Sequence, residues 1–427
     1  MKFIEDIIAD FASFIWGYPL LLLLIGGGIY LLIISRFLPF RYFGHAIQVL
    51  RGKYDDPNDP GQISHFQALT TALSATVGMG NISGVAVAIA MGGPGAIFWM
   101  WISAIVGMST KFFTSSLAIM FRGKDSEGEL QGGPMYFITE GLGKKWKPLA
   151  IFFSACAMIG ALPVFNVNQL TQAVNDILLK PNGVEVTNYT NLSIGIFLVI
   201  ITSFVVLGGL KRIGKVTARL VPSMVLLYFI LVVIILIVNI EVVPKYFLMI
   251  FTDAFSADFI KEESVLGGVV GALIILGIKR GAFSNEAGVG TAPMAHGAAK
   301  TDEPVREGLV AMLGPFIDTI IVCTLTALAI LVTDVWQTSD TNGVSLTATA
   351  FGNAMPGIGK YLLMICVAIF SISSLFSYSY YGTKSLSFLV GSKYKHFYNY
   401  LFIASILLGA TASLDTMINL IDSAFAL

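Results

Sequence analysis

The chain has 427 residues, of which 56% are hydrophobic and 12% are charged, and its mean hydropathy is +0.79. A water-soluble globular protein of this length does not need so much apolar surface, so the composition indicates a membrane protein with many crossings. Basic and acidic residues are equal in number, at 26 each, and the sequence lacks a basic run, which argues against a nucleic-acid partner.

The hydropathy predicts about eleven transmembrane helices, with about 20 apolar residues for each crossing of the bilayer. We expect them near residues 17–37, 66–91, 94–121, 148–179, 190–208, 214–240, 266–296, 305–333, 358–390, 396–413 and 414–427. The last stretch is short for a full crossing, so a truncated helix is expected there. The connections 241–265 and 334–357 are long enough for short amphipathic helices on the outer surface.

The basic residues predict the orientation of these helices. If residues 38–65 are cytoplasmic, most lysines and arginines outside the spans fall on the cytoplasmic side, as the positive-inside rule requires. The N-terminus is then outside and the C-terminus inside a cell membrane. The first apolar run follows Glu5, Asp6 and Asp10, whereas a secretory signal would start with basic residues, so this run is expected to remain as a helix.

Two of the apolar stretches are interrupted by polar, glycine-rich sequence, at residues 74–84 and 277–288. Unwound backbone is tolerated at membrane depth only where it lines a cavity, because each unsatisfied amide in lipid costs several kcal/mol. With the first helix set aside, the breaks fall in core helices one and six, so five crossings separate them. An odd separation inverts the second half relative to the first, which is typical of a transporter whose site lies at the breaks.

The predicted fold is therefore an all-α polytopic membrane protein with a five-plus-five inverted repeat. Residues 1–65 would form a peripheral helix and a cytoplasmic loop, residues 66–240 the first repeat, and residues 241–427 the second repeat.

Other classes find little support in the sequence. Cys156, Cys323 and Cys366 lie in apolar stretches without a CxxC pair, which argues against disulfides and thiolate metal sites. The four histidines are scattered near loops, and the sequence has no HExxH motif or nucleophile elbow, so we expect neither an enzyme nor a cofactor. A channel would more often show repeated pore loops.

Three motifs carry a resemblance to a known family. They are GGPGAIFWMWISAIVG at residues 92–107, QGGPMY at 131–136 and SNEAGVGTAP at 284–293. Together they closely resemble the alanine or glycine:cation symporter family, also called the sodium:alanine symporter family, over nearly the whole chain. The resemblance implies the fold of the bacterial leucine transporter, in the amino acid-polyamine-cation superfamily, and import of alanine or glycine with sodium or protons. The alternative is a cation-coupled carrier of another small amine or nucleobase, because one fold serves many substrates.

A zwitterionic amino acid needs donors for its carboxylate and acceptors for its ammonium group. The N-terminal end of a half-helix offers free amides and the positive end of the helix dipole, and its C-terminal end offers carbonyls. We expect the amides of Gly78, Met79, Gly80 and Asn81 to bind the carboxylate. We expect carbonyls near Leu276 and Gly277 to bind the ammonium group, with Ile278 or Phe283 closing the pocket.

Core helix three adds Phe165 and Gln169, which are four residues apart and share a helix face. In the resembling fold this helix forms one side of the pocket, so both are predicted substrate contacts. A buried amide must find a partner, and a hydrogen bond to another helix remains open for Gln169.

Sodium prefers several oxygen ligands, and neutral ones allow release. The resemblance implies a site made of the carbonyls of Ser74 and Val77 with the hydroxyls of Ser373 and Ser374, and Ser371 remains an alternative.

Thr76 and Asn81 match a second sodium site of some relatives. Lys279 and Arg280 in the second break would repel a further cation, so one sodium is expected.

Charged residues within spans are functional candidates because charge is costly in a bilayer. These are Lys279, Arg280, Glu286 and Asp318. A structural ion pair, such as Lys279 or Arg280 with Asp318, remains open. Lys111 is expected to snorkel or to pair near the inner face.

Overall fold

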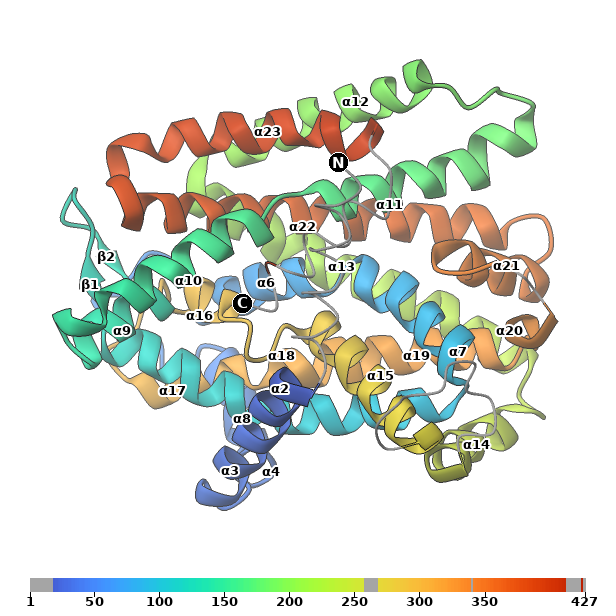
Figure 1. Cartoon of the computed structure of the whole chain (residues 1–427), viewed down its shortest axis with the longest axis horizontal. Coiled ribbons are helices and arrows are strands. Elements are labelled where there is room, and N and C mark those ends of the chain that lie inside the picture. Colours follow the sequence, from blue (N-terminus) through green and yellow to red (C-terminus); the bar gives the residue numbers. More distant parts are fainter. Residues whose placement is uncertain (1–17, 257–267, 339–340, 412–423, 425–427) are drawn as a thin grey trace.

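The computed structural model describes residues 18–256, 268–338, 341–411 and 424, and this part of the chain is almost entirely helical (Figure 1). Residues 1–17, and the predicted eleventh helix except for Ala424, lie outside the described residues.

The first part of the chain forms a short apolar helix and then the elements around the first break. The N-terminal elements are α2 (Tyr18–Leu21), η1 (Leu22–Gly26), α3 (Gly27–Ile34), α4 (Leu38–Arg41) and α5 (Phe43–Leu50). The next are α6 (His65–Thr76), η2 (Gly80–Gly84), α7 (Val85–Gly92), α8 (Gly95–Met120), β1 (Gly123–Lys124), β2 (Leu130–Gln131) and α9 (Pro134–Gly141). The two strands pair in antiparallel fashion, with Gly123 opposite Gln131.

The middle of the chain forms three long crossings and a surface helix. Its elements are η3 (Lys144–Trp146), α10 (Lys147–Gly160), α11 (Val164–Val174), η4 (Asn175–Leu179), η5 (Lys180–Asn182), α12 (Asn188–Val206), α13 (Gly209–Val238) and α14 (Val243–Ser256).

The remaining elements contain the second break. They are α15 (Gly268–Asn285), α16 (Thr291–His296), α17 (Pro304–Ala311), α18 (Leu313–Pro315), η6 (Phe316–Cys323), α19 (Thr324–Leu331), α20 (Val335–Thr338), α21 (Val344–Ala354), α22 (Gly359–Val390), η7 (Ser392–Tyr394) and α23 (Lys395–Thr411).

Six of the described helices are long and apolar enough to cross a membrane, and a seventh is counted if α6 and η2–α7 form one crossing. The predicted ranges overlap the described helices, but eleven crossings were predicted and the described residues support six or seven. The connections that were expected to hold short surface helices contain α14, α20 and α21.

The first predicted break is confirmed. Between α6 and η2 the chain leaves the helix at Val77–Met79, and the two half-helices meet at an angle of 52°. A capping box fixes the start of α6, because the hydroxyl of Ser64 accepts from the amide of Gln67, and the side chain of Gln67 accepts from the amide of Ser64.

The second break was predicted in the wrong place. Helix α15 continues without interruption through Gly277 and Gly281 to Asn285, and the chain unwinds only afterwards, at residues 286–290. A Cβ atom at Gly277 would lie 2.5 Å from the Cβ of Trp99, and one at Gly281 would lie 2.9 Å from the Cβ of Ser103. These glycines therefore allow close packing of α15 on α8 rather than unwinding.

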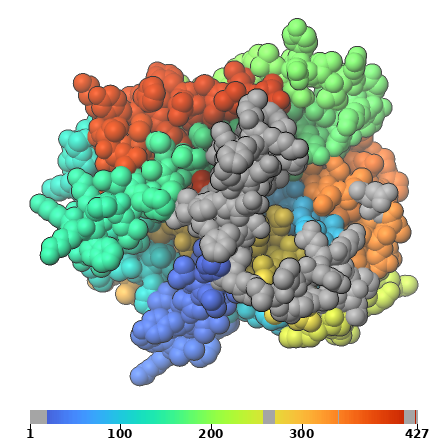
Figure 2. Space-filling view, in the orientation of Figure 1, coloured from blue at the N-terminus to red at the C-terminus, as the bar shows by residue number. Residues whose placement is uncertain are grey.

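Helix α6, which leads into the first break, lies in the middle of the bundle (Figure 1). Helices α6 and α22 pack on each other and on α13, while α12 and α23 run side by side along one edge, away from α8 and α15 (Figure 1). Figure 2 shows the same face with side chains filled in, where the α2–α3 segment protrudes at the lower edge.

Candidate functional site

The turn between α6 and η2 is shaped by one side chain. The amide of Gly78 donates to Oδ1 of Asn81 at 2.8 Å, and the amide of Asn81 donates to the carbonyl of Gly78. In a continuous helix these amides would bond to the carbonyls of Ser74 and Val77, so both carbonyls lose their usual helical donors. Of the four amides that were expected to hold a carboxylate, those of Gly78 and Asn81 already have partners, and Met79 and Gly80 begin the second half-helix.

A cavity of about 20 Å³ lies beside this turn. Its lining comes from the break between α6 and η2, the junction of α10 with α11, the end of α15, and α22. The lining residues are Ala75, Thr76, Gly78, Met79, Gly80, Gly160, Leu162, Phe165, Asn166, Phe283, Glu286 and Tyr378. A cavity of this size has room for only a few atoms. It brings together six predicted substrate residues: Thr76, Gly78, Met79, Gly80, Phe165 and Phe283.

Two aromatic rings cover part of the cavity. Phe165 from α11 and Phe283 from α15 meet edge to face, with ring centroids 5.7 Å apart. Phe283 also lies close to the second half of helix one, since a Cβ atom on Gly80 would lie 3.7 Å from its ring. Larger ligands would have to displace this pair.

The other five predicted substrate residues, Asn81 among them, do not line this cavity. For four of them the reason is that α15 ends later than expected or that Gln169 reaches another helix. Oε1 of Gln169 accepts from the hydroxyl of Ser83 at 3.1 Å, which is the interhelical bond that the sequence left open. Leu276 packs near Gly92, and Gly277 packs on α8. Ile278 lines a separate small cavity beside α2 and η1. The carbonyls near Leu276 and Gly277 therefore do not mark a helix end.

Asn81 also ties three helices together. Its side-chain amide donates to Oδ1 of Asp318 at 2.7 Å and to the hydroxyl of Ser284 at 3.1 Å. Oδ2 of Asp318 accepts from the hydroxyls of Ser284 and Thr319, at 2.7 and 2.8 Å. The partners of Asp318 are thus polar groups rather than Lys279 or Arg280, and Asn81 is a structural link rather than a lining residue.

The hydroxyls of α22 divide between two faces. A Cβ atom on Gly78 would lie 2.7 Å from Oγ of Ser374, so Ser374 faces the break directly, and its hydroxyl is 3.4 Å from the carbonyl of Ala75. Ser373 instead lies 3.5 Å from the sulfur of Met224 on α13. The hydroxyl of Ser371 is buried without a hydrogen-bond partner among the described residues.

Ser377 is a contact that the sequence analysis missed. Its hydroxyl donates to the carbonyl of Thr71 at 2.7 Å and pairs with the hydroxyl of Ser74. Ser377 is three residues after Ser374, so helical spacing was the signal that could have identified it.

A cation at the break would depend on neutral oxygens. Within the described ranges, no group of three or more His, Cys, Asp and Glu side chains could hold a metal ion. The carbonyls of Ser74 and Val77 and the hydroxyl of Ser374 are oxygen ligands of the kind that sodium accepts.

The sequence profile of the sodium:alanine symporter family matches residues 1–427. The chain belongs to this family. It is 42% identical over 420 residues to the sodium/alanine symporter AgcS of Methanococcus maripaludis, with 96% of this chain and 89% of that protein covered. It is 34% identical over 422 residues to the probable sodium/glutamine symporter GlnT of Bacillus subtilis, with coverages of 99% and 85%.

The fold is also shared with a solved transporter. The crystal structure of MhsT in complex with L-phenylalanine matches with a TM-score of 0.60 at 15% identity, covering 84% of this chain and 81% of that one. The protein is thus a multi-pass membrane transporter of a sodium-coupled amino acid symporter family, and it is not an enzyme.

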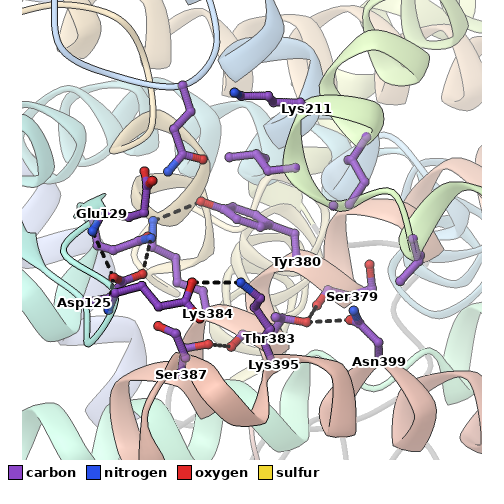
Figure 3. Close-up of a pocket in the computed structure, with 18 of the residues that line it drawn as sticks. Asp125, Glu129, Lys211, Ser379, Tyr380, Thr383, Lys384, Ser387, Lys395 and Asn399 are labelled. Atoms are coloured by element: carbon purple, nitrogen blue, oxygen red, sulfur yellow. Dashed lines mark hydrogen bonds and ion pairs between the residues drawn. The ribbon is translucent and has the colours of Figure 1, made fainter.

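The symporter has a second, larger cavity of about 590 Å³ at the end of the bundle that carries the β1–β2 hairpin (Figure 3). Both acidic and basic side chains line it, among them Asp125, Glu129, Lys211 and Lys384. The ammonium of Lys384 donates to the carbonyl of Met294 at 2.9 Å and thereby joins α22 to α16.

At the opposite end of the symporter, α21 packs on the second half of helix one. The hydroxyl of Thr347 donates to the carbonyl of Ile82 at 3.3 Å, and the hydroxyl of Ser345 donates to Asp176 at 3.0 Å. The second half of helix one is therefore covered by α21, while a wide cavity lies at the other end.

Proposed function

We propose that this protein imports a small neutral amino acid, alanine or glycine or both, together with sodium, by alternating access. The main supporting observation is the cavity of about 20 Å³ at the break in helix one, partly covered by Phe165 and Phe283. Only a small side chain suits such a site, because each further methylene has to find room between these rings.

The substrate carboxylate would bind at the start of the second half-helix. Met79 and Gly80 line the cavity there, and the amides at the start of a helix lack helical acceptors. The positive end of the helix dipole favours an anion at the same place.

One sodium ion would bind on the other side of the same turn. The hydroxyl of Ser374 faces the break, and the carbonyls of Ser74 and Val77 have lost their helical donors. Ser373 is the less suitable hydroxyl because it lies against Met224. A cation there would link the two half-helices of helix one to α22.

The proposed membrane topology keeps the eleven helices, with 1–65 as the peripheral segment and 66–240 and 241–427 as inverted repeats. The N-terminus is outside and the C-terminus is cytoplasmic. In this orientation the cavity of about 590 Å³ would open toward the cytoplasm, and α21 would lie on the outer side.

The relatives are described with different substrates, so the choice among these substrates rests on the size of the cavity. One is described as a sodium/alanine symporter and another as a probable sodium/glutamine symporter. A carrier of a larger amino acid, or of another small amine, is the competing proposal, and a proton in place of sodium is the competing coupling ion.

Uptake of radiolabelled alanine into liposomes containing the purified protein tests the proposal. An inward sodium gradient should drive uptake that unlabelled glycine competes with and that leucine and glutamine leave unchanged. Uptake driven by a pH gradient without sodium would contradict the ion, and competition by glutamine alone would contradict the substrate.

A further inference from the structure

Glu286 is a buried carboxylate in the wall of the substrate cavity. It is the first residue after α15, its side chain is 3% exposed, and its φ angle is +52°, which is a strained conformation for a residue other than glycine. Such strain persists where the surrounding structure holds it, and it is concentrated at functional sites.

Two neutral groups hold this carboxylate in place. Oε1 accepts from the hydroxyl of Tyr378 on α22 at 2.7 Å, and Oε2 accepts from the hydroxyl of Thr291 on α16. These bonds orient both oxygens, but a hydroxyl donor does not neutralise a carboxylate. Each oxygen can accept a further hydrogen bond, because a carboxylate oxygen has two lone pairs.

The charges that act on Glu286 include one buried ammonium. Lys111 on α8 is 2% exposed, so it is buried rather than snorkelling, and its charge acts on both Glu286 and Asp318. Two buried carboxylates therefore share this ammonium. A further cation beside Glu286 would lower the cost of burying its charge.

The two carboxylates differ in where they point. Asp318 accepts hydrogen bonds from Asn81, Ser284 and Thr319 and does not line the cavity, whereas Glu286 does. The negative charge that a ligand can reach is therefore that of Glu286.

We propose that the carboxylate of Glu286 binds the ammonium group of the transported amino acid. This inference rests on the proposed function. The carboxylate of Glu286 takes the place of the carbonyls near Leu276 and Gly277, which were expected to accept from the ammonium group. The substrate lies across the cavity, with its carboxylate toward Met79 and Gly80 and its ammonium toward Glu286. The site thus selects α-amines, because a ligand without an ammonium group leaves Glu286 unpaired and adds a second negative charge.

Binding of radiolabelled alanine to the purified protein, with unlabelled lactate as competitor, tests this role. Lactate has a hydroxyl group where alanine has its ammonium group. The wild type should bind alanine and ignore lactate. The Glu286→Gln variant should bind alanine about 10- to 100-fold more weakly, as expected for loss of a charged hydrogen bond, and its preference for alanine over lactate should fall by at least the same factor.

Two further measurements separate this role from a sodium ligand or a structural role. The first is the sodium affinity without alanine, measured from the effect of sodium on the midpoint of thermal unfolding. In Glu286→Gln this affinity should stay within about threefold of the wild type. The Glu286→Asp variant keeps the charge and should keep the preference for alanine over lactate, even with weaker binding. The inference is overturned if Glu286→Gln keeps wild-type alanine affinity, or if it loses sodium binding while its alanine-to-lactate preference is unchanged.

The same data separate this inference from the proposed function. If the wild type binds a different amino acid, the comparison is made with that amino acid and its 2-hydroxy analogue, and a smaller preference in Glu286→Gln still supports the role of Glu286. If the wild type binds no α-amino acid in sodium, the proposed function is wrong and the ammonium site is wrong with it. Alanine binding that Glu286→Gln retains overturns the ammonium site alone.

Discussion

The side chain of Asn81 accepts a hydrogen bond from the backbone amide of Gly78 at 2.8 Å. This bond removes the donor that a continuous helix would offer to the carbonyl of Ser74. The same side chain donates to Asp318 at 2.7 Å, so one amide both stabilises the break in helix one and joins it to η6.

Replacing Asn81 with alanine should therefore disturb the break. Asp318 loses a donor while it stays buried, which costs about 1–3 kcal/mol. We expect sodium-dependent alanine uptake to fall at least roughly 10-fold, with a lower midpoint of thermal unfolding. Asn182→Ala is the control, since Asn182 is exposed and belongs to η5 rather than to either half of helix one. Wild-type uptake by Asn81→Ala would show that the turn does not need this bond.

Ser374 and Ser373 provide a matched pair for the sodium site. Ser374→Ala removes the hydroxyl that faces the break, and we expect roughly tenfold more sodium for half-maximal alanine uptake. Ser373→Ala removes a hydroxyl that faces Met224 and should leave this concentration nearly unchanged. Titration of uptake with sodium at fixed alanine measures both. A larger effect in Ser373→Ala would place the ion on the other face of α22.

Phe165 should control the size of the accepted side chain. Phe165→Ala removes one of the two rings that partly cover the cavity, so leucine should begin to compete with alanine, and alanine should bind roughly tenfold more weakly. Phe152→Ala, at an exposed position of α10, is the control for loss of a ring. Competition by leucine in the wild type, or no change in Phe165→Ala, would mean that another residue sets the limit.

Gly277 should matter for stability through the contact of α15 with α8. A Cβ atom there would lie 2.5 Å from the Cβ of Trp99 and 2.6 Å from the carbonyl of Ala96. Gly277→Ala should cost about 1–3 kcal/mol, because overpacking moves backbone or side chains. Thermal unfolding in detergent measures the loss. Gly26→Ala is the control, since its Cβ would meet nothing within 4 Å among the described residues. Equal stability of the two variants would contradict this account of α15.

The sequence predicted the first break well and the second poorly, for a physical reason. Around residues 77–81, polar groups and glycines occur together, and Asn81 supplies the side-chain acceptor that ends the helix. Gly277 and Gly281 give a similar pattern, but glycine also permits close packing of helices, and a single sequence does not show which use applies. The actual break begins at Glu286, whose positive φ angle has no signature in residue type.

The same ambiguity affected the polar residues of the site. Gln169 could reach the cavity or another helix, and only its contact with Ser83 decides between them. Ser373 and Ser374 point in different directions around α22, and the orientation of that helix against α6 places Ser374 at the break. Helical periodicity defines which residues share a face, whereas tertiary packing defines what that face contacts.

Equilibrium binding of radiolabelled alanine to the purified symporter, titrated with sodium and in parallel with choline, tests the central claim most directly. The proposed coupling at the break in helix one predicts that alanine affinity rises at least about tenfold with sodium and stays low in choline. It also predicts that Ser374→Ala loses most of this gain. Equal alanine affinity in sodium and in choline would contradict the claim that one turn binds both ligands.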